Sequence, residues 1–174
     1  KRQLEVWLNE PVSRLRGSTW PLTGANREPL SMHSIDVPSR VTVHFPSGRV
    51  FSTTAQSAIF TYADGVVSDV SLTPLERVVP YEQALAAAEA LAAELGVSEA
   101  LRKDQFGRFA SLPKDKVFPT LPIESCYLLT AGLIPHRTGK QRVIDGWYVA
   151  LDMGVATPQV WSVYDRGWPT TCPK

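Results

Sequence analysis

Residues 41–72 have the sequence VTVHFPSGRVFSTTAQSAIFTYADGVVSDVSL, in which apolar and polar side chains alternate along short segments. Alternation with a period of two is typical of a strand that buries one face. The turn sequences Pro46-Ser47-Gly48 and Asp64-Gly65 separate these segments, and the second tolerates the positive φ angles of a tight hairpin. The stretch 41–72 therefore predicts an early antiparallel meander of three or four strands.

The segment from Tyr81 to Leu95 is predicted to be the longest helix. Its apolar side chains recur every three or four residues, and alanine, the residue with the highest helix propensity, dominates it. Gly96 is a suitable stop signal, and Ser98 is a suitable cap for a second, shorter helix ending near Phe109. The apolar stripe comprises Tyr81, Leu85, Ala88, Leu91, Ala92 and Leu95.

A second group of strands is predicted after the helices, within residues 125–164. Apolar runs or alternation mark 125–134, 143–153 and 159–164, while 113–122 reads as a loop. The order strands, helices, strands predicts an α+β fold, in which one long and one short helix pack on one face of an antiparallel sheet.

The length of the chain fits one domain over 1–174. Residues 1–40 are predicted to be an irregular segment packed on that domain, with a short strand or helical turn near 3–9. Prolines interrupt this segment repeatedly, yet Trp7 and Trp20 give it apolar anchors.

Composition excludes several classes of protein. Hydrophobic residues make up 44% and charged residues 20%, as in ordinary folded proteins, and the net charge of +1 argues against a dedicated nucleic-acid binder. No apolar run approaches the roughly 20 residues that cross a bilayer, and no signal peptide is present. Lys1-Arg2 is compatible with the remainder of a removed leader or anchor. The acidic excess within 64–104 fits a solvated helix face or an acidic docking surface.

The two cysteines, Cys126 and Cys172, are compatible with one disulfide. Such a bridge would constrain the unfolded chain by roughly 4 kcal/mol and would imply an oxidising compartment. Two unrelated free thiols are the alternative.

No established catalytic or metal motif is present. The histidines His33, His44 and His136 lack metal-ligand spacing, so no metal and no cofactor is expected, and His44 is expected on the outer face of its strand. Cys126 with His136 and Asp145 is one conceivable nucleophilic set. Glu124 and Asp145, near predicted strand ends, are candidate carboxylates for a hydrolase, with turn and edge positions as the alternative.

Two surfaces are candidates for binding. The first is the basic loop 136–142, whose cations suit a phosphate or an acidic partner, although an ordinary hairpin tip would look the same. The second is a late aromatic group that would be either core or an exposed recognition surface. The candidate binding residues are Arg137, Lys140, Arg142, Trp147, Trp161, Tyr164, Asp165 and Arg166.

These observations favour a non-enzymatic module of the bacterial cell envelope that binds another protein, as an immunity protein, an inhibitor or an assembly factor. The expected location is periplasmic or envelope-anchored, with a cytoplasmic location as the alternative. Two other functions stay open: a hydrolase that uses Glu124, Asp145 or His136, and a carrier of a small molecule or lipid between sheet and helix.

Overall fold

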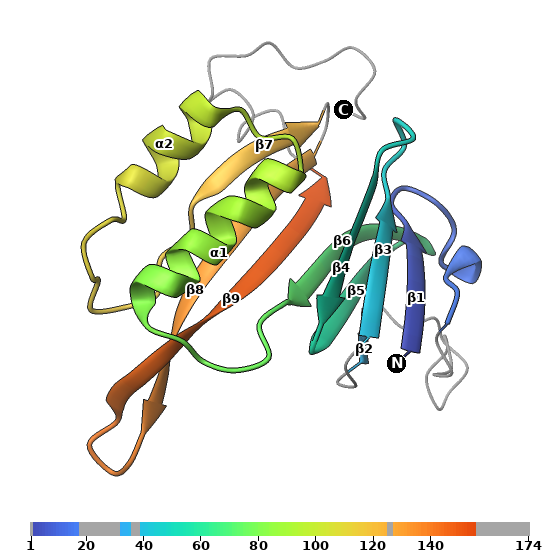
Figure 1. The fold of residues 1–174 in the computed structure, drawn as a ribbon. Coiled ribbons are helices and arrows are strands. Elements are labelled where there is room, and N and C mark those ends of the chain that lie inside the picture. The colour runs from blue at the N-terminus through green and yellow to red at the C-terminus, as the bar shows by residue number, and fades with distance from the viewer. Residues whose placement is uncertain (1, 18–31, 36–38, 125–126, 156–174) are drawn as a thin grey trace. The chain divides into compact units, whose positions relative to one another are not determined.

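The computed structural model describes residues 2–17, 32–35, 39–124 and 127–155 (Figure 1). It has the predicted α+β architecture, with sheets of mainly antiparallel strands and two helices among these residues. The chain divides into two compact units, Lys1–Glu76 and Arg77–Lys174. The single domain over 1–174 stays a prediction.

The first unit contains a three-stranded sheet of β1 (Arg2–Trp7), β3 (Ser39–His44) and β4 (Val50–Ala55), in the order β1-β3-β4. β1 runs parallel to β3, whereas β3 and β4 form the antiparallel hairpin that the turn at 46–48 predicts. Val41 and Val43 are fully buried, while His44 lies on the outer face as expected.

The first unit also contains β2 (Met32–Ile35), β5 (Ser57–Ala63) and β6 (Val66–Thr73), which pair antiparallel in the order β2-β5-β6. Asp64 and Gly65 have φ angles of 53° and 75° and turn β5 into β6. This hairpin confirms the positive-φ turn that the sequence predicts.

The predicted meander is divided between the two sheets of the first unit. β4 ends at Ala55 and β5 begins at Ser57, so the chain bends at Gln56, whose N–H donates to the carbonyl of Thr73 at 2.7 Å. One residue is too short for a hairpin loop, and the chain therefore passes from one sheet to the next.

The N-terminal segment contributes more regular structure than predicted. β1, β2 and the 3₁₀ turn η1 (Val12–Arg14) lie within 1–40. The N–H of Asn9 donates to the carbonyl of Val67 at 2.8 Å, and Val67 returns a bond to Glu10 at 3.0 Å. These bonds connect the end of β1 to β6, so the segment is part of the unit's framework.

The second unit begins with helices α1 (Tyr81–Glu94) and α2 (Glu99–Gly107). Ser98 caps α2 as predicted, since its hydroxyl accepts a bond from the N–H of Leu101 at 3.3 Å. The buried stripe of α1 differs from the predicted one because Leu85 and Leu91 are only half-buried. Ala84 is buried in addition, and the other predicted positions are buried as expected: Tyr81, Ala88, Ala92 and Leu95.

The sheet of the second unit consists of β7 (Thr120–Glu124), β8 (Tyr127–Thr138) and β9 (Val143–Val155), antiparallel in the order β7-β8-β9. Both helices cover one face of it (Figure 1). Trp147, Val149, Leu151 and Met153 alternate along β9 and are all buried. The Trp147 ring contacts the Tyr81 ring of α1, so this is the face that the helices cover.

Two boundaries in this unit differ from the sequence-based predictions. β7 begins at Thr120, inside the segment predicted as a loop, and β8 continues through His136 and Arg137, which the sequence assigns to a turn. β7 pairs with β8, and β8 pairs with the long β9, so long-range pairing extends both strands. The predicted strand at 159–164 lies outside the described residues.

Among the described residues, neither helix is long and apolar enough to cross a membrane.

Candidate functional site

The end of the β8–β9 hairpin is an exposed part of the second unit. The two strands run past the end of α1 (Figure 1), and residues 136–143 are all exposed. Pairing continues to Thr138 and Val143, with a register shift after His136. Gly139 and Arg142 have φ angles of 76° and 52° and close the turn through a backbone bond of 3.1 Å. The predicted basic loop is therefore a strand pair with a four-residue tip.

Arg137 fastens this tip to the loop between α2 and β7. Its Nη1 donates to the carbonyl of Arg142 at 3.1 Å, and its Nη2 donates to the carbonyl of Lys114 at 3.0 Å. The planar guanidinium suits two acceptors on different segments. Arg137, predicted as a binding residue, thus has a positioning role that brings the backbones of Lys114 and Arg142 together.

Four exposed cations gather here and form what we call the basic rim: Lys114, Arg137, Lys140 and Arg142. Within the described part of the chain, the side chains of Lys114, Lys140 and Arg142 make no hydrogen bond or ion pair. The nearby carboxylate of Asp115 accepts a bond from the N–H of Lys116 at 2.8 Å. The rim is therefore a local surplus of positive charge.

An open hollow of about 380 Å³ lies beside the rim, and we call it the apolar hollow. Three segments of the second unit build it: 78–81 before and at the start of α1, 112–113 after α2, and 144–147 on β9. Its lining residues are Val78, Val79, Pro80, Tyr81, Leu112, Pro113, Ile144, Asp145, Gly146 and Trp147.

Backbone pairing holds the first wall of the hollow against β9. The N–H of Val79 donates to the carbonyl of Trp147 at 2.9 Å, and Trp147 returns a bond of 2.8 Å. A Cβ at Gly146 would approach the Val78 side chain to 2.9 Å, closer than side chains pack. Only glycine at 146 permits this approach without displacement of Val78.

Aromatic packing fixes the inner wall. The Tyr81 and Trp147 rings meet edge to face, with their centroids 4.8 Å apart. The Tyr81 hydroxyl donates to the carbonyl of Phe109, and burial raises the pKa of this hydroxyl. The phenol is therefore a neutral donor that joins the start of α1 to the segment after α2.

His136 and Asp145 form a polar pair at the edge of the hollow. Nδ1 of His136 lies 2.7 Å from Oδ1 of Asp145, and their side chains are 48% and 39% exposed. Nε2 of His136 has no hydrogen-bond partner among the described residues. An imidazole oriented by a carboxylate is able to act as a general base. Within the described part of the chain, no hydroxyl or thiol is hydrogen-bonded to His136.

The structure separates other residues that the sequence grouped. Trp147 is only 2% exposed and packs in the core, so it offers a partner little more than an edge in the hollow. Glu124 pairs with Tyr127 at the start of β8, whereas His136 lies near the end of that strand. At the usual rise per residue, the two backbone positions are about 30 Å apart. Glu124 therefore does not join His136 and Asp145.

Several predicted residues lie outside the described residues. They are Cys126 and Cys172 of the predicted disulfide, and Trp161, Tyr164, Asp165 and Arg166 of the predicted aromatic surface. The disulfide and the late aromatic surface stay predictions. Consequently, the basic rim and the apolar hollow are the candidate site that the structure supports.

Sequence reasoning missed the hollow because its walls come from three distant segments. One signal was present in the sequence: Leu112-Pro113 is an apolar pair inside a polar loop, and Leu112 is 70% exposed. A large exposed leucine beside cations is a composition that interfaces use.

The first unit carries a polar aromatic group on its outer sheet face. The Trp7 and His44 rings stack with centroids 4.4 Å apart, and Nε2 of His44 lies 3.0 Å from Oε1 of Glu5. The guanidinium of Arg14 sits 4.7 Å from the Trp7 centroid. Because these contacts engage the Trp7 ring, the group reads as surface packing that stabilises β1 and β3.

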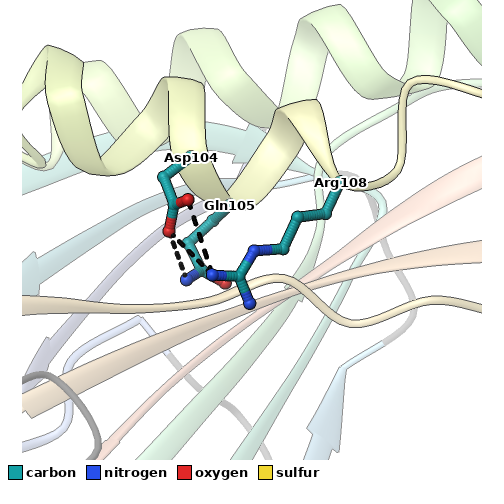
Figure 2. Close-up of polar contacts among 3 residues, drawn as sticks. All are labelled: Asp104, Gln105 and Arg108. Carbon is teal, nitrogen blue, oxygen red and sulfur yellow. Dashed lines mark hydrogen bonds and ion pairs between the residues drawn. The ribbon is translucent and has the colours of Figure 1, made fainter.

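A further polar group, on α2, is satisfied within itself. The carboxylate of Asp104 accepts hydrogen bonds from Gln105 at 3.2 Å and from Arg108 at 3.1 Å, and Figure 2 shows these three side chains. Such exposed pairs contribute little to stability. Among the described residues, no three metal-ligating side chains gather, and this group offers no reactive geometry either.

Comparisons with models of known protein families, with curated proteins and with solved structures found no match to this chain.

Proposed function

We propose that the chain is a non-enzymatic binding module of the bacterial cell envelope, such as an immunity protein, an inhibitor or an assembly factor. It contacts another protein through the end of the β8–β9 hairpin. The observation that carries the proposal is the adjacency of the basic rim and the apolar hollow on one exposed end of the second unit.

This arrangement supports binding for a physical reason. Interfaces between proteins combine an apolar centre with a polar rim, and arginine is enriched among residues that dominate affinity. The rim cations have no acidic partner in the described part of the chain, so a partner would not have to break existing pairs. The clamp by Arg137 also holds the surface in place before binding, which lowers the entropic cost of association.

The envelope location is supported by composition, namely the alanine- and proline-rich sequence and the cysteines Cys126 and Cys172. Fractionation of cells that express the protein, with and without reducing agent on the gel, tests this part. Recovery in the cytoplasmic fraction with reduced thiols would contradict it.

Affinity capture from envelope extract tests the binding role. Three baits are compared: the wild-type chain, Lys140→Glu at the tip, and Arg40→Glu on β3. Arg40→Glu is the control, because it makes the same change in charge at an exposed position of the first unit. We expect wild type and Arg40→Glu to recover the same partner and Lys140→Glu to lose it. Equal recovery by all three proteins would remove the hairpin from the proposal.

A hydrolase is the second candidate, and the contact of 2.7 Å between His136 and Asp145 favours it. In this role His136 Nε2 takes a proton from water, and Asp145 orients the ring. The test is turnover of chromogenic esters, glycosides and phosphates by the purified protein. Turnover that is lost in His136→Gln and retained in Lys140→Glu would replace the binding proposal with this one.

A further inference from the structure

The basic rim and the apolar hollow are one continuous surface. Lys114 directly follows Leu112 and Pro113 in the hollow wall, and Arg142 precedes Ile144 by two positions on β9. The guanidinium of Arg137 bonds to the carbonyls of Lys114 and Arg142 at once, which fixes the two sides of the rim relative to each other. A bound segment that enters the hollow therefore passes the cations.

The charge of this surface selects the partner's charge. The cations are Lys114, Lys116, Arg137, Lys140 and Arg142, whereas the carboxylates are Asp115 and Asp145. Asp145 is engaged with His136, and Asp115 is engaged with a backbone N–H. Five cations against two carboxylates leave this surface with a positive net charge, which favours carboxylates on the partner.

The shape of the hollow selects an apolar group. Its volume of about 380 Å³ exceeds that of a single large side chain, and its walls are mostly aliphatic and aromatic. Leu112, which is 70% exposed, would lose most of this exposed surface under a bound side chain. Burial of such a side chain is favourable because it removes apolar surface from water on both partners.

We infer that the contact segment of the partner is an acidic peptide carrying a large apolar side chain, which occupies the apolar hollow while flanking carboxylates meet the basic rim. This inference rests on the proposed binding function and names the chemistry of the partner. The apolar side chain anchors the peptide, and the carboxylates give orientation and a fast, salt-dependent association.

Selection from a random peptide library displayed on phage tests the inference, because it does not require the partner to be identified first. The full chain is the target, and Lys140→Glu serves for counter-selection. We expect enriched peptides with a Leu, Ile, Phe or Trp flanked by Asp or Glu. Absence of enrichment, or enriched peptides without acidic residues, would overturn the inference.

Two variants separate the roles of charge and apolar contact for an enriched peptide, measured by fluorescence anisotropy. Leu112→Lys adds positive charge but removes an apolar wall, and we expect at least tenfold weaker binding. Lys140→Glu should also bind at least tenfold more weakly, while Arg40→Glu should match wild type. Stronger binding by Leu112→Lys would show that charge alone attracts the peptide, and would contradict the inference.

The two proposals fail in different ways. If envelope capture depends on Lys140 but the selected peptides lack the acidic and apolar pattern, this inference fails and the binding function stands. If capture does not depend on Lys140 either, the proposed function fails as well. A third outcome is that a fatty acid displaces a selected peptide and the capture recovers no protein. It would identify a carrier and overturn both the binding function and this inference.

Discussion

Gly146 is the residue that most directly shapes the candidate site. A Cβ there would meet Cβ and Cγ2 of Val78 at 2.9 Å, so Gly146→Ala forces Val78 and Val79 away from β9. We expect a loss of stability of roughly 1–3 kcal/mol, as in other overpacked sites. Chemical denaturation measures the change in the free energy of unfolding. Gly107→Ala is the control, because a Cβ added there meets nothing within 4 Å. This substitution should stabilise α2 by up to about 1 kcal/mol. Equal effects of the two substitutions would contradict the close approach.

Because of Tyr62, we expect the first unit to lose stability at alkaline pH. Burial raises the pKa of its hydroxyl from 10.0 to about 12. Below pH 10.0 both the native and the unfolded chain keep this proton, so the contribution is complete there. As pH rises from 10.0 toward about 12, the unfolded chain loses the proton first, and we expect the native state to lose roughly 2 kcal/mol.

Tyr62→Phe checks this assignment by denaturation at a series of pH values. The Tyr62 hydroxyl is buried and has no hydrogen-bond partner among the described residues. The variant should therefore keep or gain stability at neutral pH and lose the alkaline decline attributed to Tyr62. Tyr81→Phe, which removes a bond to Phe109, should instead destabilise at neutral pH. An unchanged alkaline decline in Tyr62→Phe would show that another group is responsible.

Arg137 positions the loop that carries Leu112 and Lys114. Arg137→Lys keeps the charge but does not span two carbonyls, so we expect the amides of residues 112–116 to exchange faster with solvent. The lost bonds correspond to about 1–2 kcal/mol of local stability. Arg142→Lys is the control, because its side chain has no partner within the described residues. Hydrogen exchange that is the same in both variants would refute the clamp.

At the scale of the element, α1 packs on the sheet through small side chains. Ala84, Ala88 and Ala92 are fully buried, so the helix backbone lies close to β8 and β9. Ala88→Leu should destabilise by roughly 1–3 kcal/mol, since the larger side chain has no space there. Ala86→Leu, on the exposed face, should be nearly neutral. Thermal unfolding measures the stability of both variants. An Ala88→Leu variant as stable as the wild type would contradict the close packing.

Helix starts, helix caps and hairpin turns depend on neighbouring residues in the chain, so the sequence predicts them. Tyr81 begins α1, Ser98 caps α2 and Asp64-Gly65 turns β5 into β6, each as expected from residue chemistry. Within the predicted stripe of α1, Leu85 and Leu91 are only half-buried and Ala84 is buried in addition, because leucine periodicity carries no information on how closely a helix approaches its sheet. Depth of burial depends on the partner surface, which lies elsewhere in the chain.

The bend at Gln56 and the full length of β8 depend on long-range pairing. Gln56 bonds to Thr73, and β8 extends to Thr138 because β9 supplies a partner strand along its whole length. Neither partner is adjacent in sequence. Alternation therefore predicts strands but does not assign them to sheets.

At the scale of the whole molecule, the order strands, helices, strands was enough to predict the α+β class. It did not predict that β1 runs parallel to β3, nor that segments 78–81, 112–113 and 144–147 meet at one hollow. The basic tip was predictable because Arg137, Lys140 and Arg142 are neighbours in sequence. The hollow was not predictable, because only the tertiary fold brings its three lining segments together.

Site-specific photo-crosslinking in living cells tests most directly whether the basic rim and the apolar hollow contact the same partner. A photoreactive amino acid replaces Lys140, Leu112 or, as the control, Arg40. We expect an adduct with the same partner protein from positions 140 and 112, and none with that partner from position 40. An adduct from position 40 alone, or different partners at 140 and 112, would contradict it.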